Sequence, residues 1–247
     1  MSEVLTEIGG VNVTIKITAA AVSLAVILLF TALWLAERKK RTGRAASFGE
    51  WMNGIGYGLL PAAAVWKAFE HMMRSGSGSE VAEPLPPVPW LTENGLYCPC
   101  RIEMSAALLC FIGLSLWLML RKSEPENRGD LLLVALCLWA SVRIVTEDFR
   151  PSAGNIVRYI YCGAVMLCLF WWTVRRNRIR LSPARTAADW VAAVFCTGII
   201  AVTAEGILSV GSRIGDLAVI AGCAVLEAAL TLIAGSDCRK LERIPSE

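Results

Sequence analysis

Seven long apolar segments alternate with short polar stretches along this chain. Each has close to the ~20 residues that a helix needs to cross the hydrocarbon core of a bilayer. The pattern therefore predicts an all-α, polytopic membrane protein with about seven transmembrane helices, organised as a single transmembrane domain over residues 1–247. The segments run roughly over residues 11–36, 48–72, 99–120, 131–149, 154–174, 187–210 and 214–234.

The second segment, 48–72, departs from a uniform apolar run, because Gly54, Gly56, Gly58 and Pro61 interrupt it. Small residues let helices approach closely within a membrane, whereas Pro also kinks helices. The segment is therefore expected to be either a closely packed helix or a kinked or re-entrant one.

Composition supports the membrane class and excludes others. Hydrophobic residues make up 55% of the chain and charged residues 18%, with a mean hydropathy of +0.55, which is not typical of a soluble domain. The net charge of +3 is modest, and the basic residues stand in short blocks between apolar segments. We therefore expect no nucleic-acid partner.

The position of these basic blocks predicts an orientation. Blocks of Lys and Arg follow the first, third, fifth and seventh segments, at 38–44, 121–128, 175–185 and 239–243. Cytoplasmic loops of membrane proteins are enriched in Lys and Arg. The N-terminus is thus expected outside and the C-terminus in the cytoplasm, which requires an odd number of spans.

The fourth segment carries a charged stripe. Arg143, Glu147 and Arg150 follow the uncharged run 131–142 and fall within about 60° of one helix face. Arg143 is ~18 Å along the helix axis from Leu131, which places it in the outer half of the bilayer. Ionisable groups at such depth usually face a bundle interior or a cavity, so the stripe is the first candidate for a functional site.

A series of short motifs stands between residues 86 and about 180. They are Pro89-Trp90, the segment CPCRIEM at 98–104 that opens a helix, Arg121-Lys122 with Gly129, and RIVTEDFR at 143–150. In order and spacing this region resembles the C-terminal half of the bacterial prolipoprotein diacylglyceryl transferases, and RIVTEDFR is the most specific element. The segment 187–235 is an extra helix pair relative to that family, and the family's H-G-G-L motif is absent.

The resemblance implies a function. The family moves a diacylglyceryl group from phosphatidylglycerol to the lipobox cysteine thiol of a prolipoprotein signal peptide at the bacterial inner membrane, without a cofactor or a metal ion. By resemblance, Arg143 contacts the phosphate, Glu147 holds Arg143, and Arg150 lies at the level of the lipid headgroups. Arginine suits this role because its planar fork can bind two phosphate oxygens.

Other polar residues are expected on the same outer side. Arg101 and Glu103 open the third helix and can extend the polar site, and Arg158 can reach it from the fifth. The alternative for each of these three residues is an ordinary charged side chain at the membrane surface, outside any site. His71, the chain's one histidine, is a candidate base for the thiol or a solvated residue near the membrane surface.

Alternatives to the transferase stay open. One is a non-catalytic relative that binds phospholipid or a signal peptide. Another is a transporter or channel subunit, in which Glu205 and Glu227 of the last two segments line a polar path. Cys98-Pro-Cys100 could bind a metal ion, but no second Cys or His pair stands nearby, so no metal site is expected.

Overall fold

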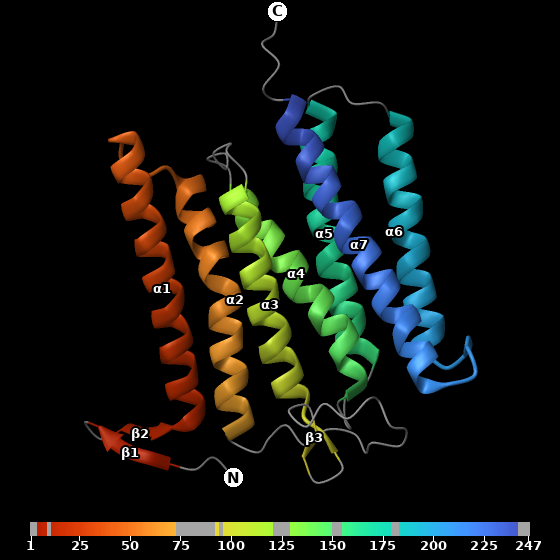
Figure 1. The fold of residues 1–247 in the computed structure, drawn as a ribbon, viewed down its shortest axis with the longest axis horizontal. Coiled ribbons are helices and arrows are strands. Elements are labelled where there is room, and N and C mark those ends of the chain that lie inside the picture. The colour runs from red at the N-terminus through yellow and green to blue at the C-terminus, as the bar shows by residue number, and fades with distance from the viewer. Residues whose placement is uncertain are drawn as a thin grey trace, which may run out of the picture. The chain divides into compact units, whose positions relative to one another are not determined.

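The computed structural model describes residues 4–8, 11–72, 92–93, 96–120, 129–149, 155–178 and 183–241. These residues form seven α-helices, one short 3-10 helix and two short antiparallel strand pairs (Figure 1). The helices are α1 (Ile15–Thr42), α2 (Phe48–Met72), α3 (Pro99–Leu120), α4 (Asp130–Thr146), α5 (Asn155–Arg178), α6 (Pro183–Ala204) and α7 (Arg213–Leu241). The remaining elements are η1 (Glu147–Phe149), β1 (Val4–Ile8), β2 (Val11–Thr14), β3 (Thr92–Glu93) and β4 (Leu96–Tyr97).

The helical character expected from the sequence is confirmed. Among the described residues, five helices are long and apolar enough to cross a membrane, namely α1, α3, α5, α6 and α7. Large apolar side chains such as Leu28, Leu109 and Phe195 lie exposed on them, as expected for surfaces that face lipid. The helix α4 has only 17 residues, and the count of seven spans stays a prediction.

Two predicted boundaries were wrong. The first segment does not begin as a helix at residue 11, because Val11–Thr14 pairs with β1 instead; its alternation of β-branched and polar residues suits a strand. The sixth segment does not reach residue 210. The helix α6 ends at Ala204, and Gly206 follows with φ +71. Glycine adopts this left-handed conformation readily, which ends the helix although apolar residues continue.

The chain divides into two compact units. The first comprises Met1–Ala135 and Phe149–Pro151, and the second comprises Leu136–Asp148 and Ser152–Glu247. The first therefore contains α1, α2, α3 and the start of α4, while the second contains the rest of α4 with α5, α6 and α7. The prediction of one transmembrane domain is not tested by this division.

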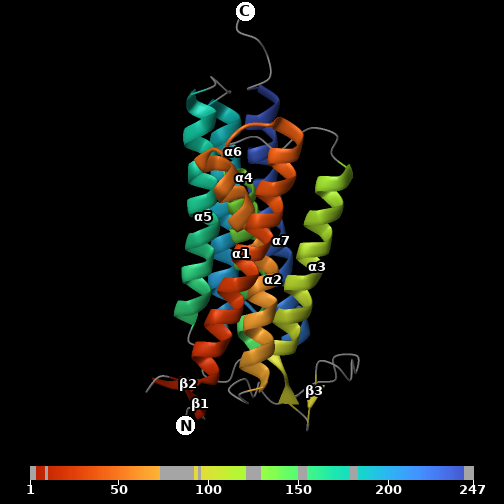
Figure 2. The same ribbon diagram turned by 90° about the vertical axis from the view of Figure 1, so that its left-hand side faces the viewer.

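Within the first unit, α1 and α2 run side by side (Figures 1 and 2). The helix α2 runs unbroken from Phe48 to Met72 through Pro61, so it is not re-entrant within the structure. A Cβ atom built on Gly54 would lie 2.9 Å from Thr31 Cγ2, and one on Gly58 would lie 2.9 Å from Ile27 Cα. These glycines therefore allow close packing against α1, which was one of the two expectations for this segment.

The opposite side of α2 meets the beginning of α4. A Cβ atom on Gly56 would lie 2.4 Å from the backbone N and Cα of Leu132. In addition, the side-chain oxygen of Asn53, which is 1% exposed, accepts a hydrogen bond of 3.0 Å from the backbone N–H of Leu131. This N–H belongs to the first turn of α4, where it has no acceptor within the helix. Asn53 and Gly56 together fix the start of α4 on α2.

The N-terminus of α2 is held by a capping box. Glu50 Oε2 accepts a hydrogen bond of 2.7 Å from the backbone N–H of Ser47, and Ser47 Oγ accepts one of 3.4 Å from the N–H of Glu50. This reciprocal arrangement satisfies two backbone donors at a helix start. Arg38 of α1 donates to Glu50 Oε1 at 3.2 Å. The buried pair ties the end of α1 to the start of α2.

Candidate functional site

Arg143 and Glu147 form a buried ion pair. Arg143 lies in the last turn of α4, and Glu147 is the first residue after this helix. Arg143 Nη2 lies 2.8 Å from Glu147 Oε2, and the two residues are only 6% and 5% exposed. The spacing of four residues brings both side chains to one helix face. The guanidinium carbon of Arg143 also lies 5.2 Å from the ring centroid of Tyr161 on α5, within the range of a cation–π contact.

Arg158 of α5 lies against the same end of α4. Its side chain is 2% exposed, and Nε donates a hydrogen bond of 3.1 Å to the carbonyl oxygen of Ile144. Carbonyls in the last turn of a helix have no partner within the helix, and a cation there is favoured by the helix dipole. Arg158 also donates to Asn155 Oδ1 at 3.3 Å. Arg158 therefore contacts Ile144, the residue that follows Arg143 in the sequence.

The first turns of α5 also hold the end of α6. Asn155 Nδ2 donates a hydrogen bond of 3.2 Å to the carbonyl oxygen of Ala204, the last residue of α6. Tyr159 Oη donates to Glu205 Oε1 at 2.5 Å. The beginning of α5 thus supplies donors to the carboxyl ends of both α4 and α6. Glu205 is exposed and serves here as an acceptor for tyrosine.

A second polar cluster lies in the first unit, where the end of α2 meets the start of α3. Lys67 Nζ lies 2.7 Å from Glu103 Oε2 and 2.6 Å from Glu70 Oε2. Glu103 is 0% exposed and Lys67 is 7% exposed. A carboxylate buried to this extent requires a close cation. Lys67 is this cation, and its pairing with Glu103 was not predicted from the sequence.

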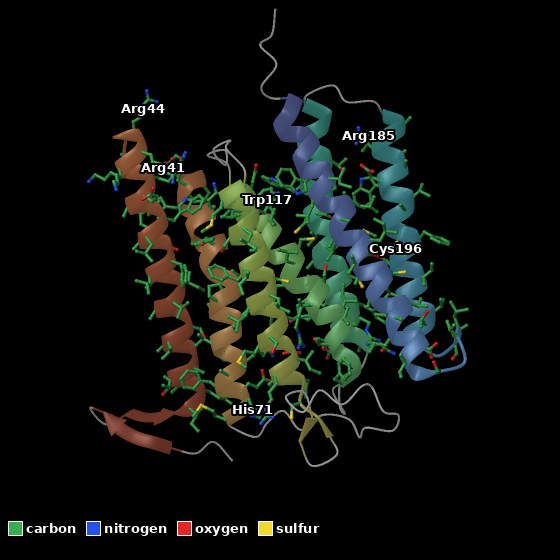
Figure 3. The ribbon with its side chains drawn as sticks, in the orientation of Figure 1. Arg41, Arg44, His71, Trp117, Arg185 and Cys196 are labelled. Atoms are coloured by element: carbon green, nitrogen blue, oxygen red, sulfur yellow. The ribbon has the colours of Figure 1, made fainter. Side chains whose placement is uncertain are left out.

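Arg101 and His71 belong to the same cluster. Arg101 Nε donates a hydrogen bond of 3.0 Å to His71 Nε2. In this contact Arg101 is the donor and the lone pair of His71 Nε2 is the acceptor. Figure 3 shows His71 at the end of the first unit away from Arg41 and Arg44. The cluster therefore lies opposite the basic end of α1.

The two clusters differ in their cations. The first contains Lys67 and Arg101 beside Glu70 and Glu103, whereas the second contains two arginines, Arg143 and Arg158, beside Glu147. Arginine can bind two phosphate oxygens at once through parallel hydrogen bonds. The second-unit cluster is accordingly the better candidate for binding phosphate.

The structure thus brings together Arg143, Glu147 and Arg158, and separately Arg101 and Glu103 with Lys67, Glu70 and His71. Arg150 lies outside the described residues. Tyr161 and Asn155 were not anticipated as members of the site. The signal in the sequence for a cation–π partner was the pair of tyrosines Tyr159 and Tyr161, which follow Asn155 by four and six residues.

Cysteine and metal chemistry contribute little to the described part of the chain. Cys98 and Cys100 are buried at the start of α3. In the described ranges, no group of three or more His, Cys, Asp or Glu side chains is arranged to hold a metal ion. Cys98 and Cys100 therefore contribute to the packing around the start of α3.

Comparison with known proteins adds no assignment. The chain matches no protein-family model, no curated protein and no solved structure.

Proposed function

We propose that this chain is a multi-pass protein of the bacterial inner membrane that acts as a phosphatidylglycerol–prolipoprotein diacylglyceryl transferase. The observation that supports it is the buried cluster of Arg143, Glu147 and Arg158 at one end of two apolar helices. The cluster combines an anion-binding charge with an apolar surround, as the headgroup and acyl chains of a phospholipid require. The resemblance of RIVTEDFR at 143–150 to the family pattern supports this reaction class.

The proposed orientation places this cluster on the outer side of the membrane. Arg143 lies at the end of α4 that is remote from the basic block 121–128, and Arg158 lies at the end of α5 remote from the block 175–185. Basic blocks mark the cytoplasmic side. In this orientation the N-terminus is outside, the C-terminus is inside, and a secreted prolipoprotein reaches the cluster from the outer leaflet.

In the proposed reaction, the thiolate of the lipobox cysteine attacks the glycerol carbon that bears the phosphate. A C–S bond forms, the C–O bond breaks, and glycerol phosphate leaves with the bonding electron pair. Arg143 binds the phosphate and stabilises the charge on the leaving group. Glu147 holds the guanidinium of Arg143 in place at 2.8 Å, and Arg158 fixes the end of α4 through the carbonyl of Ile144.

One observation favours a second candidate, a relative that binds phospholipid or a signal peptide without transfer. The family's H-G-G-L motif is absent from the sequence, and the lone pair of His71 Nε2 already accepts a hydrogen bond from Arg101. A base must have a free lone pair to take the proton of the thiol. His71 could act as a base only after Arg101 moves away.

The test is a transfer assay with the purified full-length protein. Phosphatidylglycerol labelled in its diacylglycerol part is incubated with a lipobox peptide, alongside a peptide in which serine replaces the cysteine. We expect label on the cysteine peptide alone, and its loss in Arg143→Ala. If an authentic transferase works in the same mixture and this protein transfers nothing while it still binds phosphatidylglycerol, the non-catalytic candidate is correct.

A further inference from the structure

Glu227 is a carboxyl group buried within a predicted membrane span. It belongs to α7, inside the candidate span Ile214–Ala234, and is 1% exposed. Its Oε1 accepts a hydrogen bond of 2.5 Å from Thr197 Oγ1 on α6. Its Oε2 is buried and has no hydrogen-bond partner among the described residues. The proposed transferase site makes no use of this group.

The groups that face Glu227 are neutral. Four thiols interact electrostatically with its carboxyl, one each from α4, α5, α6 and α7: Cys137, Cys162, Cys196 and Cys223. Thr231 Oγ1 donates a hydrogen bond of 2.9 Å to the backbone carbonyl of Glu227 and is also hydrogen-bonded to Cys137. The surroundings therefore contain hydroxyl and thiol groups from every neighbouring helix.

One of these groups, Cys162 on α5, interacts electrostatically with the cation Arg158. The hydrogen bonds of its guanidinium go to the carbonyl of Ile144 and to Asn155 Oδ1. Among the described residues, Glu227 takes part in no ion pair. Glu227 is thus surrounded by groups that do not offset a negative charge.

Three other buried glutamates in the described structure show the contrast. Glu103 lies 2.7 Å from Lys67 Nζ, Glu147 lies 2.8 Å from Arg143 Nη2, and Glu50 lies 3.2 Å from Arg38 Nη2. Each is paired with a cation, as an ionised buried carboxylate requires. The close partner of Glu227 is a hydroxyl group instead. An ionised carboxylate without a cation is strongly disfavoured inside a membrane, whereas a neutral carboxylic acid is tolerated.

We propose that Glu227 is a proton-binding site within the membrane-embedded part of the second unit, and that the proton is bound at neutral pH. A proton needs one lone pair, and Oε2 offers one. A monovalent metal ion would need a shell of several oxygen ligands, whereas the groups around Glu227 are mainly thiols, which suit soft metals. The ligand is therefore a proton rather than an alkali cation. This inference does not depend on the transferase proposal.

The first test is an infrared difference spectrum of the purified protein at pH 7, where an ordinary glutamate with a pKa of ~4.3 is ionised. The spectrum of Glu227→Gln is subtracted from that of the wild type. We expect the C=O band of a protonated carboxylic acid in the difference. Glu205→Gln is the matched control, because Glu205 is exposed at the end of α6 and should give a carboxylate band. A carboxylate band for Glu227, or one that responds to sodium ions, would overturn the proposal.

A second measurement uses the wild type alone and so does not depend on the variant folding. A hydrophobic carbodiimide modifies protonated carboxyl groups in membranes, and mass spectrometry of peptides locates the product. We expect modification at Glu227 at pH 7 and its loss when the pH is raised until the acid band disappears. Equal modification of Glu227 and the ion-paired Glu103 and Glu147, or none at Glu227, contradicts a protonated Glu227.

Discussion

Lys67 and Glu103 join α2 to α3 through an ion pair of 2.7 Å in which the carboxylate is fully buried. Replacing Lys67 with Met leaves Glu103 without its cation. Removal of one partner of a buried ion pair typically costs about 3–5 kcal/mol of stability. We therefore expect Lys67→Met to lower the free energy of unfolding by several kcal/mol, measured by denaturant titration in detergent micelles.

The double variant Lys67→Met/Glu103→Leu is the control for this prediction. Apolar residues that replace both members of a buried pair are often neutral or stabilising. We expect the double variant to recover part of the stability lost in the single variant, because Glu70, 2.6 Å from Lys67 Nζ in the wild type, still loses that cation. A double variant that is less stable than Lys67→Met would mean that Glu103 is held by other partners, and that the pair is not the main link between the two helices.

Among the described glycines of the first unit, Gly56 leaves the least room for a side chain, since an added Cβ would lie 2.4 Å from two backbone atoms of Leu132. Gly56→Ala must therefore separate α2 from the start of α4. Overpacking of this kind costs about 1–3 kcal/mol, although alanine is otherwise preferred to glycine in a helix by ~0.5–1 kcal/mol. We expect a clear decrease in Tm, measured by the loss of helical circular dichroism on heating.

Gly113→Ala in α3 is the matched control, because a Cβ at Gly113 meets nothing within 4 Å. This variant should leave Tm unchanged or raise it slightly. If Gly56→Ala and Gly113→Ala shift Tm by the same amount, the contact of Gly56 with Leu132 does not limit the approach of α2 to α4.

The helices could be predicted from the sequence where polar residues border the apolar runs. The bounds of α2 and α3 coincide with the predicted segments, because Ser47 caps α2 and Pro99 opens α3. The end of α6 could not be predicted from hydropathy, since Ile207 and Leu208 continue the apolar run beyond Gly206. Hydropathy measures partition into lipid, whereas a left-handed glycine ends the backbone hydrogen-bond pattern.

The candidate site was predicted in part for a similar reason. The pairing of Arg143 with Glu147 follows from their spacing along one helix, which sequence shows directly. The partners that come from other helices, Tyr161 for Arg143 and Lys67 for Glu103, depend on packing. Those contacts depend on how each helix is rotated about its axis and shifted along it relative to its neighbour. The spacing of apolar residues along the sequence does not determine these two quantities.

The orientation of the chain can be tested with reporter fusions. We expect an alkaline phosphatase fused after residue 45 to be inactive, because α1 should cross from outside to inside. A fusion after residue 79 should be active if α2 also crosses the membrane, since the enzyme folds only outside the cytoplasm. An inactive fusion after residue 79 would show that α2 does not span and would reduce the number of transmembrane helices.

Arg143 should bind the lipid phosphate through its planar fork as well as its charge. Arg143→Lys keeps the charge but not the fork, so it separates the two contributions. Hydrogen bonds to charged groups contribute about 1.5–3 kcal/mol, which corresponds to a loss of about 10- to 100-fold in affinity for a short-chain phosphatidylglycerol. Binding is measured in zwitterionic micelles.

Arg185→Lys is the control, because Arg185 is exposed at the start of α6. This variant should bind the lipid as tightly as the wild type does. Equal affinities for all three proteins would show that the phosphate is bound elsewhere.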